Sequence, residues 1–195
     1  MSKAFIWTLA DRPNIPKTWG EMDFKNSVFE TYLLLAHLEP GRDYGIARIR
    51  FRNWSVEQLS TWHCPPVITT PVVSPALRAF LEDKIGLDEI LFYPVSLICK
   101  NGTLDGYSFI SPRRKVSCLD FEKSDLKIDH VTNGVADVFR WKRLVFKERC
   151  LGAMKVAWEA HLPGRIVVSE DLKNAIVEFC GPEVMFTLPE DHAWG

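Results

Sequence analysis

The sequence lacks the features that would place it in a membrane or among disulfide-stapled secreted proteins. No run approaches eighteen consecutive apolar residues, and only a short apolar stretch precedes Asp11. The cysteines are odd in number, scattered and without a C-x-x-C pair, at Cys64, Cys99, Cys118, Cys150 and Cys180. This pattern is typical of buried free thiols in a reducing compartment, so we expect a cytoplasmic protein with no membrane partner.

An excess of charge of either sign is also lacking. The chain carries 24 Lys and Arg against 25 Asp and Glu, which gives a formal net charge of -1. A chain without a global field has no general attraction to nucleic acid or to an anionic membrane. We therefore expect a partner that recognises a local surface, and no nucleic-acid partner.

Motifs for known catalysis are missing as well. The sequence contains no phosphate loop, no G-x-G-x-x-G, no G-x-S-x-G and no H-E-x-x-H. His63 and Cys64 are adjacent, and no second Cys/His pair completes a zinc site. We expect no catalytic residue, cofactor or metal, and a protein that is not an enzyme. One alternative stays open, a cryptic Cys-His site such as Cys118 with His130 and Asp120, because such sites assemble from distant positions.

A short pattern occurs twice in the chain and organises the expected fold. Val72-Val73-Ser74 and Val167-Val168-Ser169 each combine a buried strand with a serine that can cap a helix. Pro75 follows the first serine at a position where its missing N–H costs nothing, and Glu170 follows the second at the positive helix end. The repeats predict two strand-helix-strand units, at about 71–93 and 165–187, with the first helix spanning 75–84.

The segment between the two units predicts a β-meander. Apolar runs at 90–99 and 106–110 flank Asn101-Gly102, a hairpin turn in which both residues tolerate positive φ. A further short strand is expected at 116–120. Helical spacing of apolar residues over 153–162 predicts a helix that ends before the second unit.

The expected fold is therefore α+β, mainly antiparallel sheet with short helices. A first strand is expected at 4–9, and the apolar run at 28–35 fits either a buried helix or a strand. With 47% hydrophobic residues the chain can bury a core that is stable without cross-links. We predict a single domain over 1–195, or two closely packed lobes, a variable 1–64 and a core 65–187.

Two basic segments are candidates for binding a partner. From 46 to 52 basic and apolar residues alternate, which is typical of a solvated sheet face but also supplies a cationic binding face. From 140 to 149 there are five bases and one acid. Arginine beside tryptophan is common in protein-binding hot spots, and it can also stack single-stranded nucleic acid. The candidate residues are Arg48, Arg50, Arg52, Trp54, Arg140, Trp141, Lys142 and Arg143.

The order of several motifs resembles one known family. The motifs are Tyr93-Pro94-Val95, then Val116-Ser117-Cys118-Leu119-Asp120 with Ser124 after it, then Phe139-Arg140, and finally Val168-Ser169-Glu170 opening the last helix. Over about residues 65–187 this order resembles the Imm11 (DUF1629) immunity proteins of bacterial polymorphic toxin systems. The family's usual "tGlxF" ending is replaced here by residues 181–186. These are scaffold motifs, so they name no toxin.

The resemblance implies a non-catalytic cytoplasmic protein that binds and neutralises a cognate toxin. Such toxins include secretion-system effectors used in bacterial competition, and the pair works as a toxin-antitoxin couple. Many inhibitors of nuclease toxins are strongly acidic, and this chain is not, so we expect binding through shape and the basic strands. An enzyme with a cryptic Cys/His site and a nucleic-acid-binding module are the alternatives. The oligomeric state is not predicted.

Overall fold

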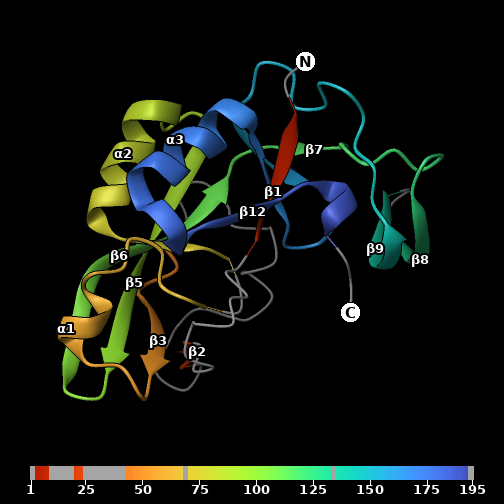
Figure 1. The fold of residues 1–195 in the computed structure, drawn as a ribbon. Coiled ribbons are helices and arrows are strands. Elements are labelled where there is room, and N and C mark those ends of the chain that lie inside the picture. The colour runs from red at the N-terminus through yellow and green to blue at the C-terminus, as the bar shows by residue number, and fades with distance from the viewer. Residues whose placement is uncertain (1–2, 9–19, 24–42, 68–69, 133–134, 193–195) are drawn as a thin grey trace.

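A computed structural model describes residues 3–8, 20–23, 43–67, 70–132 and 135–192. Within these residues the chain forms two five-stranded sheets, a two-stranded hairpin and three α-helices (Figure 1). Most neighbouring strands are antiparallel, so the expected α+β class is confirmed. The apolar run at 28–35 lies outside the described residues.

The first sheet is built around the N-terminal strand β1. Its order is β12 (Met185–Thr187), β1 (Ala4–Thr8), β11 (Ile166–Ser169), β10 (Val156–Glu159) and β7 (Lys115–Val116). Strands β11 and β12 both pair antiparallel with β1, so they run in the same direction on its two sides. Helix α3 (Glu170–Cys180) connects them, which confirms the predicted unit at 165–187.

The second sheet repeats this arrangement. Its order is β2 (Glu21–Met22), β3 (Ala47–Phe51), β5 (Ile90–Cys99), β6 (Gly102–Pro112) and β4 (Val72–Val73). Strands β4 and β5 flank β6 and are both antiparallel to it, and helix α2 (Pro75–Ile85) links them. The unit predicted at 71–93 is therefore confirmed. Strands β1 and β3 place parts of the first 64 residues in both sheets, and the division into lobes stays a prediction.

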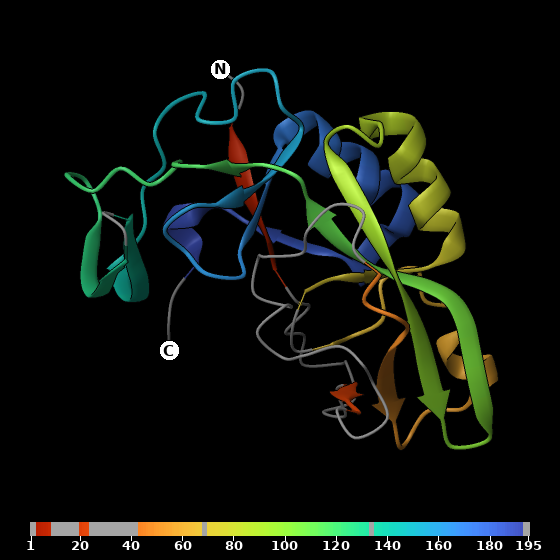
Figure 2. The ribbon, with the colours of Figure 1, turned by 180° about the vertical axis from the view of Figure 1, so that it is seen from behind.

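The two linking helices begin alike and pack together. Ser74 Oγ accepts the Leu77 N–H at 3.2 Å, and Ser169 Oγ accepts the Leu172 N–H at 3.3 Å, as the repeated pattern predicts. Each helix buries every fourth residue in one shared core, and Figures 1 and 2 show the pair side by side. Burial of each such aliphatic side chain contributes about 1.5 to 3 kcal/mol. The buried positions are Leu77, Leu81 and Ile85 in α2 and Leu172, Ile176 and Cys180 in α3.

The helix predicted at 153–162 is wrong. Residues 156–159 form strand β10, which lies between β11 and β7 and is buried along its whole length. Val156 belongs to the core under the helices, and Ala157 belongs to a second cluster on the other side of the sheet. A strand covered on both faces is apolar without alternation, and periodicity alone does not separate such a run from a helix.

The hairpin between β5 and β6 is confirmed, but its turn lies one residue earlier than expected. Cys99 pairs with Gly102, so Lys100 and Asn101 form the loop. Neither Asn101 nor Gly102 has a positive φ, so the conformational reason given for this pair is wrong. Asn101 instead accepts the Val56 N–H at 2.8 Å, which ties the turn to helix α1 (Val56–Leu59).

The strand expected at 116–120 is shorter than predicted. Pairing is confined to β7 (Lys115–Val116), which runs parallel to β10, and to an isolated bridge between Leu119 and Phe146. The chain then turns at 121–123 into β8 (Asp125–Thr132) and β9 (Val135–Arg143). Figures 1 and 2 show this hairpin projecting at the opposite end of the molecule from α2.

Candidate functional site

The basic strand β3 has the alternation that its sequence predicts. Ile49 and Phe51 are fully buried in the core of the second sheet, while Arg48 and Arg50 are exposed on the other face. Arg52 follows the strand and is also exposed. The prediction of a basic outer face is therefore correct in its geometry.

Acidic residues neutralise part of the positive charge on this face of β3. Arg50 forms an ion pair with Asp23 at 2.7 Å, and Arg52 forms a longer one with Glu21 at 3.3 Å. Strand β2 brings these acids alongside β3 through antiparallel pairing. The Arg52–Glu21 pair is exposed on both sides, and such pairs contribute at most about 1 kcal/mol. They nevertheless reduce the charge that β3 can offer to a partner.

The two candidate tryptophans are buried rather than exposed. Trp54 and Trp141 each retain only 7% of their exposure. Trp54 packs edge-on against Phe51, and Trp141 stacks on the His192 ring while its Nε1–H donates to the His192 carbonyl at 2.6 Å. Burial, together with the nearby charge of Arg165, lowers the pKa of His192 to about 4. We therefore leave both rings out of any contact surface.

The structure does not bring the two basic segments together. Arg140, Lys142 and Arg143 are exposed on β9, in the projecting hairpin, and both views of the ribbon show β9 far from β3 (Figures 1 and 2). The end of β9, at Arg143, lines a concave surface. That surface, rather than β3, is the candidate functional site.

A cavity of about 440 Å³ opens where the end of β9, the start of β1 and the short helix η3 (Pro189–Asp191) meet. A second cavity, of about 380 Å³, shares Lys3, Ala4 and Arg149 with the first. We call the two together the β1 groove. Its charged lining consists of the bases Lys3, Arg143, Lys147 and Arg149 and the acids Glu148 and Glu190.

The bases of the β1 groove differ from those of β3 in their partners. Among the described residues none of the four forms an ion pair. Arg143 donates to the Lys123 carbonyl at 2.7 Å, and the Lys147 ammonium lies 3.3 and 3.4 Å from Ser117 oxygens, which are all neutral acceptors. The groove thus holds four bases against two acids, and the bases form no direct ion pair among the described residues.

Arg149 also has an unusual backbone. Its φ is 51°, the one positive φ of a non-glycine residue in the described parts of the chain. This conformation costs an L-residue about 1 to 2 kcal/mol, and residues held in such conformations cluster at functional sites. The Gly152 N–H donates to the Arg149 carbonyl at 2.8 Å, which closes the turn beneath it.

A disulfide holds the other side of this turn. Cys118 and Cys150 are bonded, with their Cα atoms 4.8 Å apart. The expectation that all five cysteines are free is therefore wrong for this pair, and it is confirmed for Cys64, Cys99 and Cys180, which are free and buried. No spacing signal marked the pair, because the two residues are brought together by pairing between the distant segments 118–120 and 145–147.

The bond also removes the proposed catalytic cysteine. The Cys118 sulfur is fully buried and bonded to Cys150, so it offers no thiolate to act as a nucleophile. Among the free cysteines, burial raises the pKa of Cys180 to about 12 and that of Cys64 still further. The cryptic site with Cys118 is therefore wrong, and the His130 side chain lies outside the described part of the structure.

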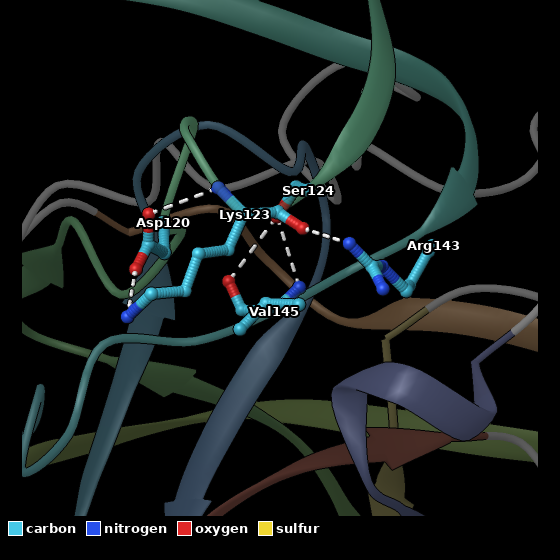
Figure 3. Close-up of polar contacts among 5 residues, drawn as sticks. All are labelled: Asp120, Lys123, Ser124, Arg143 and Val145. Carbon is cyan, nitrogen blue, oxygen red and sulfur yellow. Dashed lines mark hydrogen bonds and ion pairs between the residues drawn. The ribbon is translucent and has the colours of Figure 1, made fainter.

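A turn at the base of the hairpin positions the groove wall. The Asp120 carboxylate accepts the Lys123 N–H and pairs with its ammonium, both at 3.2 Å, while Ser124 Oγ accepts the Val145 N–H at 2.9 Å. Figure 3 shows this network leading to Arg143. Desolvation is the largest single effect and raises the pKa of Asp120, but hydrogen bonds and the charge of Lys123 together outweigh it and hold the pKa below its usual range. The turn thus fixes two residues that line the groove.

Glu159 anchors the loops behind this wall. It is 3% exposed, and its Oε1 accepts the N–H groups of Cys118 and Leu119 at 3.0 and 3.1 Å. Its Oε2 accepts those of His161 and Leu162. Burial raises the pKa of Glu159, and the N–H donors and His161 oppose this by favouring the carboxylate. No sequence signal indicates this role, because Glu159 lies within the segment that is predicted as a helix.

Comparison with known families identifies the chain. A model of the immunity protein family Imm11 matches residues 61–187, well over half of the sequence. The chain belongs to the Imm11 immunity protein family. The resemblance seen over about 65–187 is thereby confirmed. The comparison with curated proteins finds no match.

The residues matched by the Imm11 model include some of the candidate surfaces and leave out others. It contains β9, the 143–152 wall of the β1 groove and both cysteines of the disulfide, whereas β3 and Lys3 lie outside it. The Imm11 motifs are structural: Asp120 and Ser124 close the hairpin turn, and Ser169 caps α3. In the described part of this Imm11 chain, no helix has the length and apolar character needed to cross a membrane, and no cluster of three or more His, Cys, Asp or Glu is arranged for a metal ion.

Proposed function

We propose that this protein neutralises the toxic domain of a bacterial polymorphic toxin by direct, non-catalytic contact in the cytoplasm. The observation that carries the proposal is the Imm11 match over residues 61–187. An immunity protein of this kind protects a cell from a toxin delivered by its kin or made by the cell itself. The toxin domain is then the cognate partner, and no cofactor is required.

The chemistry of the candidate site supports binding. A concave surface with an apolar lining and bases that lack acidic partners among the described residues is suited to a protein ligand. The one cysteine placed in a catalytic constellation is bonded to another cysteine. These features favour an inhibitor that covers its target over an enzyme that modifies it.

We place the contact surface on the exposed bases of β9 and the adjoining groove. Arg140, Lys142 and Arg143 lie on the hairpin that projects from the body, so a partner can reach them. The β3 bases are the rival surface, but two of the three are paired with acids. On β9, by contrast, Arg143 donates to the neutral Lys123 carbonyl, so it gains more from a new carboxylate than a base that is already paired with an acid.

Co-expression with the toxin domain encoded beside this gene tests the proposal. Wild-type protein should restore growth and form a complex that survives purification. Reversing Arg140, Lys142 and Arg143 to Glu should weaken the complex roughly 100-fold, because three ion pairs of about 1 kcal/mol each are lost. Growth rescue should then fail while the far-UV spectrum and the melting temperature stay close to those of wild type.

The matched control reverses Arg48, Arg50 and Arg52 to Glu, the same change of charge on β3. We expect it to retain protection. Loss of protection in this control alone would move the contact surface to β3. Growth rescue by wild type without any stable complex would instead favour an enzyme. Affinity for nucleic acid that falls steeply with salt would favour a nucleic-acid-binding module.

A further inference from the structure

We infer that the β1 groove receives an extended, acidic segment of the toxin, whose carboxylates are bound by Lys147 and Arg149. The inference rests on the proposed function and adds the chemistry of the contacted segment. Its starting point is the shape of the site. Because the two cavities share Lys3, Ala4 and Arg149, they adjoin one another at the start of β1.

The lining of the groove matches the side chains of an extended chain. Ala4, Phe146, Leu151, Leu188 and Pro189 provide apolar surface between the basic residues. Successive side chains of an extended peptide point in opposite directions, so acidic and apolar residues in alternation can meet both kinds of lining. A strongly hydrophilic acidic tail would leave the apolar part of the groove without a partner.

The charges select carboxylates over other groups. Arg149 and Arg143 each present a guanidinium, which binds a carboxylate through two parallel hydrogen bonds, and Lys3 and Lys147 add ammonium groups. Among the described residues none of these four bases forms an ion pair with an acid. A segment that supplies the missing negative charge gains both attraction and faster association.

The groove is also prepared before the partner arrives. Arg149 is held at a φ of 51° by a turn that is closed through Gly152 and bonded through Cys150 to Cys118. Arg143 is fixed by its hydrogen bond to the Lys123 carbonyl. Side chains whose backbone is already ordered lose less freedom on binding, which improves affinity without adding contacts.

The two acids of the groove add selectivity. Glu148 lies between Lys147 and Arg149 in sequence, and Glu190 lies in helix η3 on the opposite wall. Each repels a carboxylate placed next to it, so only a segment with the right spacing of acids satisfies the bases without meeting the two glutamates. This gives the groove a means to distinguish one toxin from another.

Binding of a catalytically inactivated toxin domain, taken from the gene beside this one, tests the inference. The variant Lys147→Glu/Arg149→Glu should bind at least 30-fold more weakly than wild type. Lys100→Glu/Arg114→Glu carries the same change of charge on exposed residues outside the groove and should bind within 3-fold of wild type. Because Arg149→Glu keeps a side chain at the same φ, the melting temperature should change little.

Carbodiimide cross-linking gives a second readout, because it joins an amine to a carboxylate only when the two are in contact. In the wild-type complex we expect Lys3 or Lys147 to be joined to Asp or Glu residues of a single toxin segment. Changing those acids to Lys should restore binding to the Lys147→Glu/Arg149→Glu variant. Cross-links confined to lysines elsewhere, such as Lys127, or to a second copy of this chain, would overturn the inference while leaving the proposed function intact. A wild-type protein that forms no complex at all would instead contradict the proposed function.

Discussion

Replacing Glu159 with alanine is expected to lower the free energy of unfolding by about 3 to 5 kcal/mol. The reason is the number of donors that depend on one buried carboxylate. In the alanine variant four backbone N–H groups lose their acceptor together, and Glu159 is only 3% exposed, so little water can replace it. The four donors belong to Cys118, Leu119, His161 and Leu162. Equilibrium denaturation in urea measures the loss directly.

Two further variants make this measurement specific. Glu159→Gln keeps the size of the side chain but turns an N–H₂ group toward two of the donors, so it should fall between wild type and alanine. Glu178→Ala removes an exposed carboxylate from α3 and should change stability by less than about 0.5 kcal/mol. A loss of under about 1 kcal/mol in Glu159→Ala would show that water replaces the carboxylate as acceptor and that the four hydrogen bonds of Glu159 are not important for stability.

Reducing the Cys118–Cys150 disulfide is expected to lower the free energy of unfolding by about 3 to 4 kcal/mol, from the loop entropy of its 32-residue separation. The bond joins the start of the hairpin region to the turn that carries Arg149, so its loss should also weaken toxin binding. Denaturation with and without reductant measures the first effect, and titration of the toxin domain measures the second.

The double variant Cys118→Ser/Cys150→Ser is the control for this experiment. It should resemble the reduced wild-type protein and show no further response to reductant, because the remaining cysteines are free and buried. Equal stability of the oxidised and reduced wild-type protein would contradict the prediction. Because two of the five cysteines are bonded, the cysteine pattern no longer supports a reducing compartment. The cytoplasmic location therefore rests on the family alone and stays a prediction.

The parts of the fold that could be predicted depend on local signals. Ser74 and Ser169 mark helix starts because an N-cap is made within four residues of chain, and both caps are present. The strands at 90–99 and 47–51 follow from apolar runs or alternation and from nearby turns. In each case the signal that predicts the element lies within the segment or directly beside it.

The parts that could not be predicted depend on residues far apart in sequence. Strand β10 is set by burial between two other strands, and the disulfide is set by a bridge formed after the hairpin. The β1 groove joins Lys3 to the 143–149 segment and to η3 only because β1 is inserted between β11 and β12. The bases of the 140–149 segment were noted as a cluster, but Lys3 carried no signal of its own.

The central claim is that this Imm11 protein neutralises its toxin by occupying it rather than by changing it. Titrating the protein into a fixed amount of active toxin domain, and following residual toxin activity, tests this most directly. A binding inhibitor should abolish activity at a 1:1 molar ratio, with a sharp break when the toxin concentration is well above Kd, and activity should return when the complex is denatured and the toxin refolded. Complete and irreversible loss of toxin activity at a small fraction of one equivalent would contradict the account and would favour an enzyme.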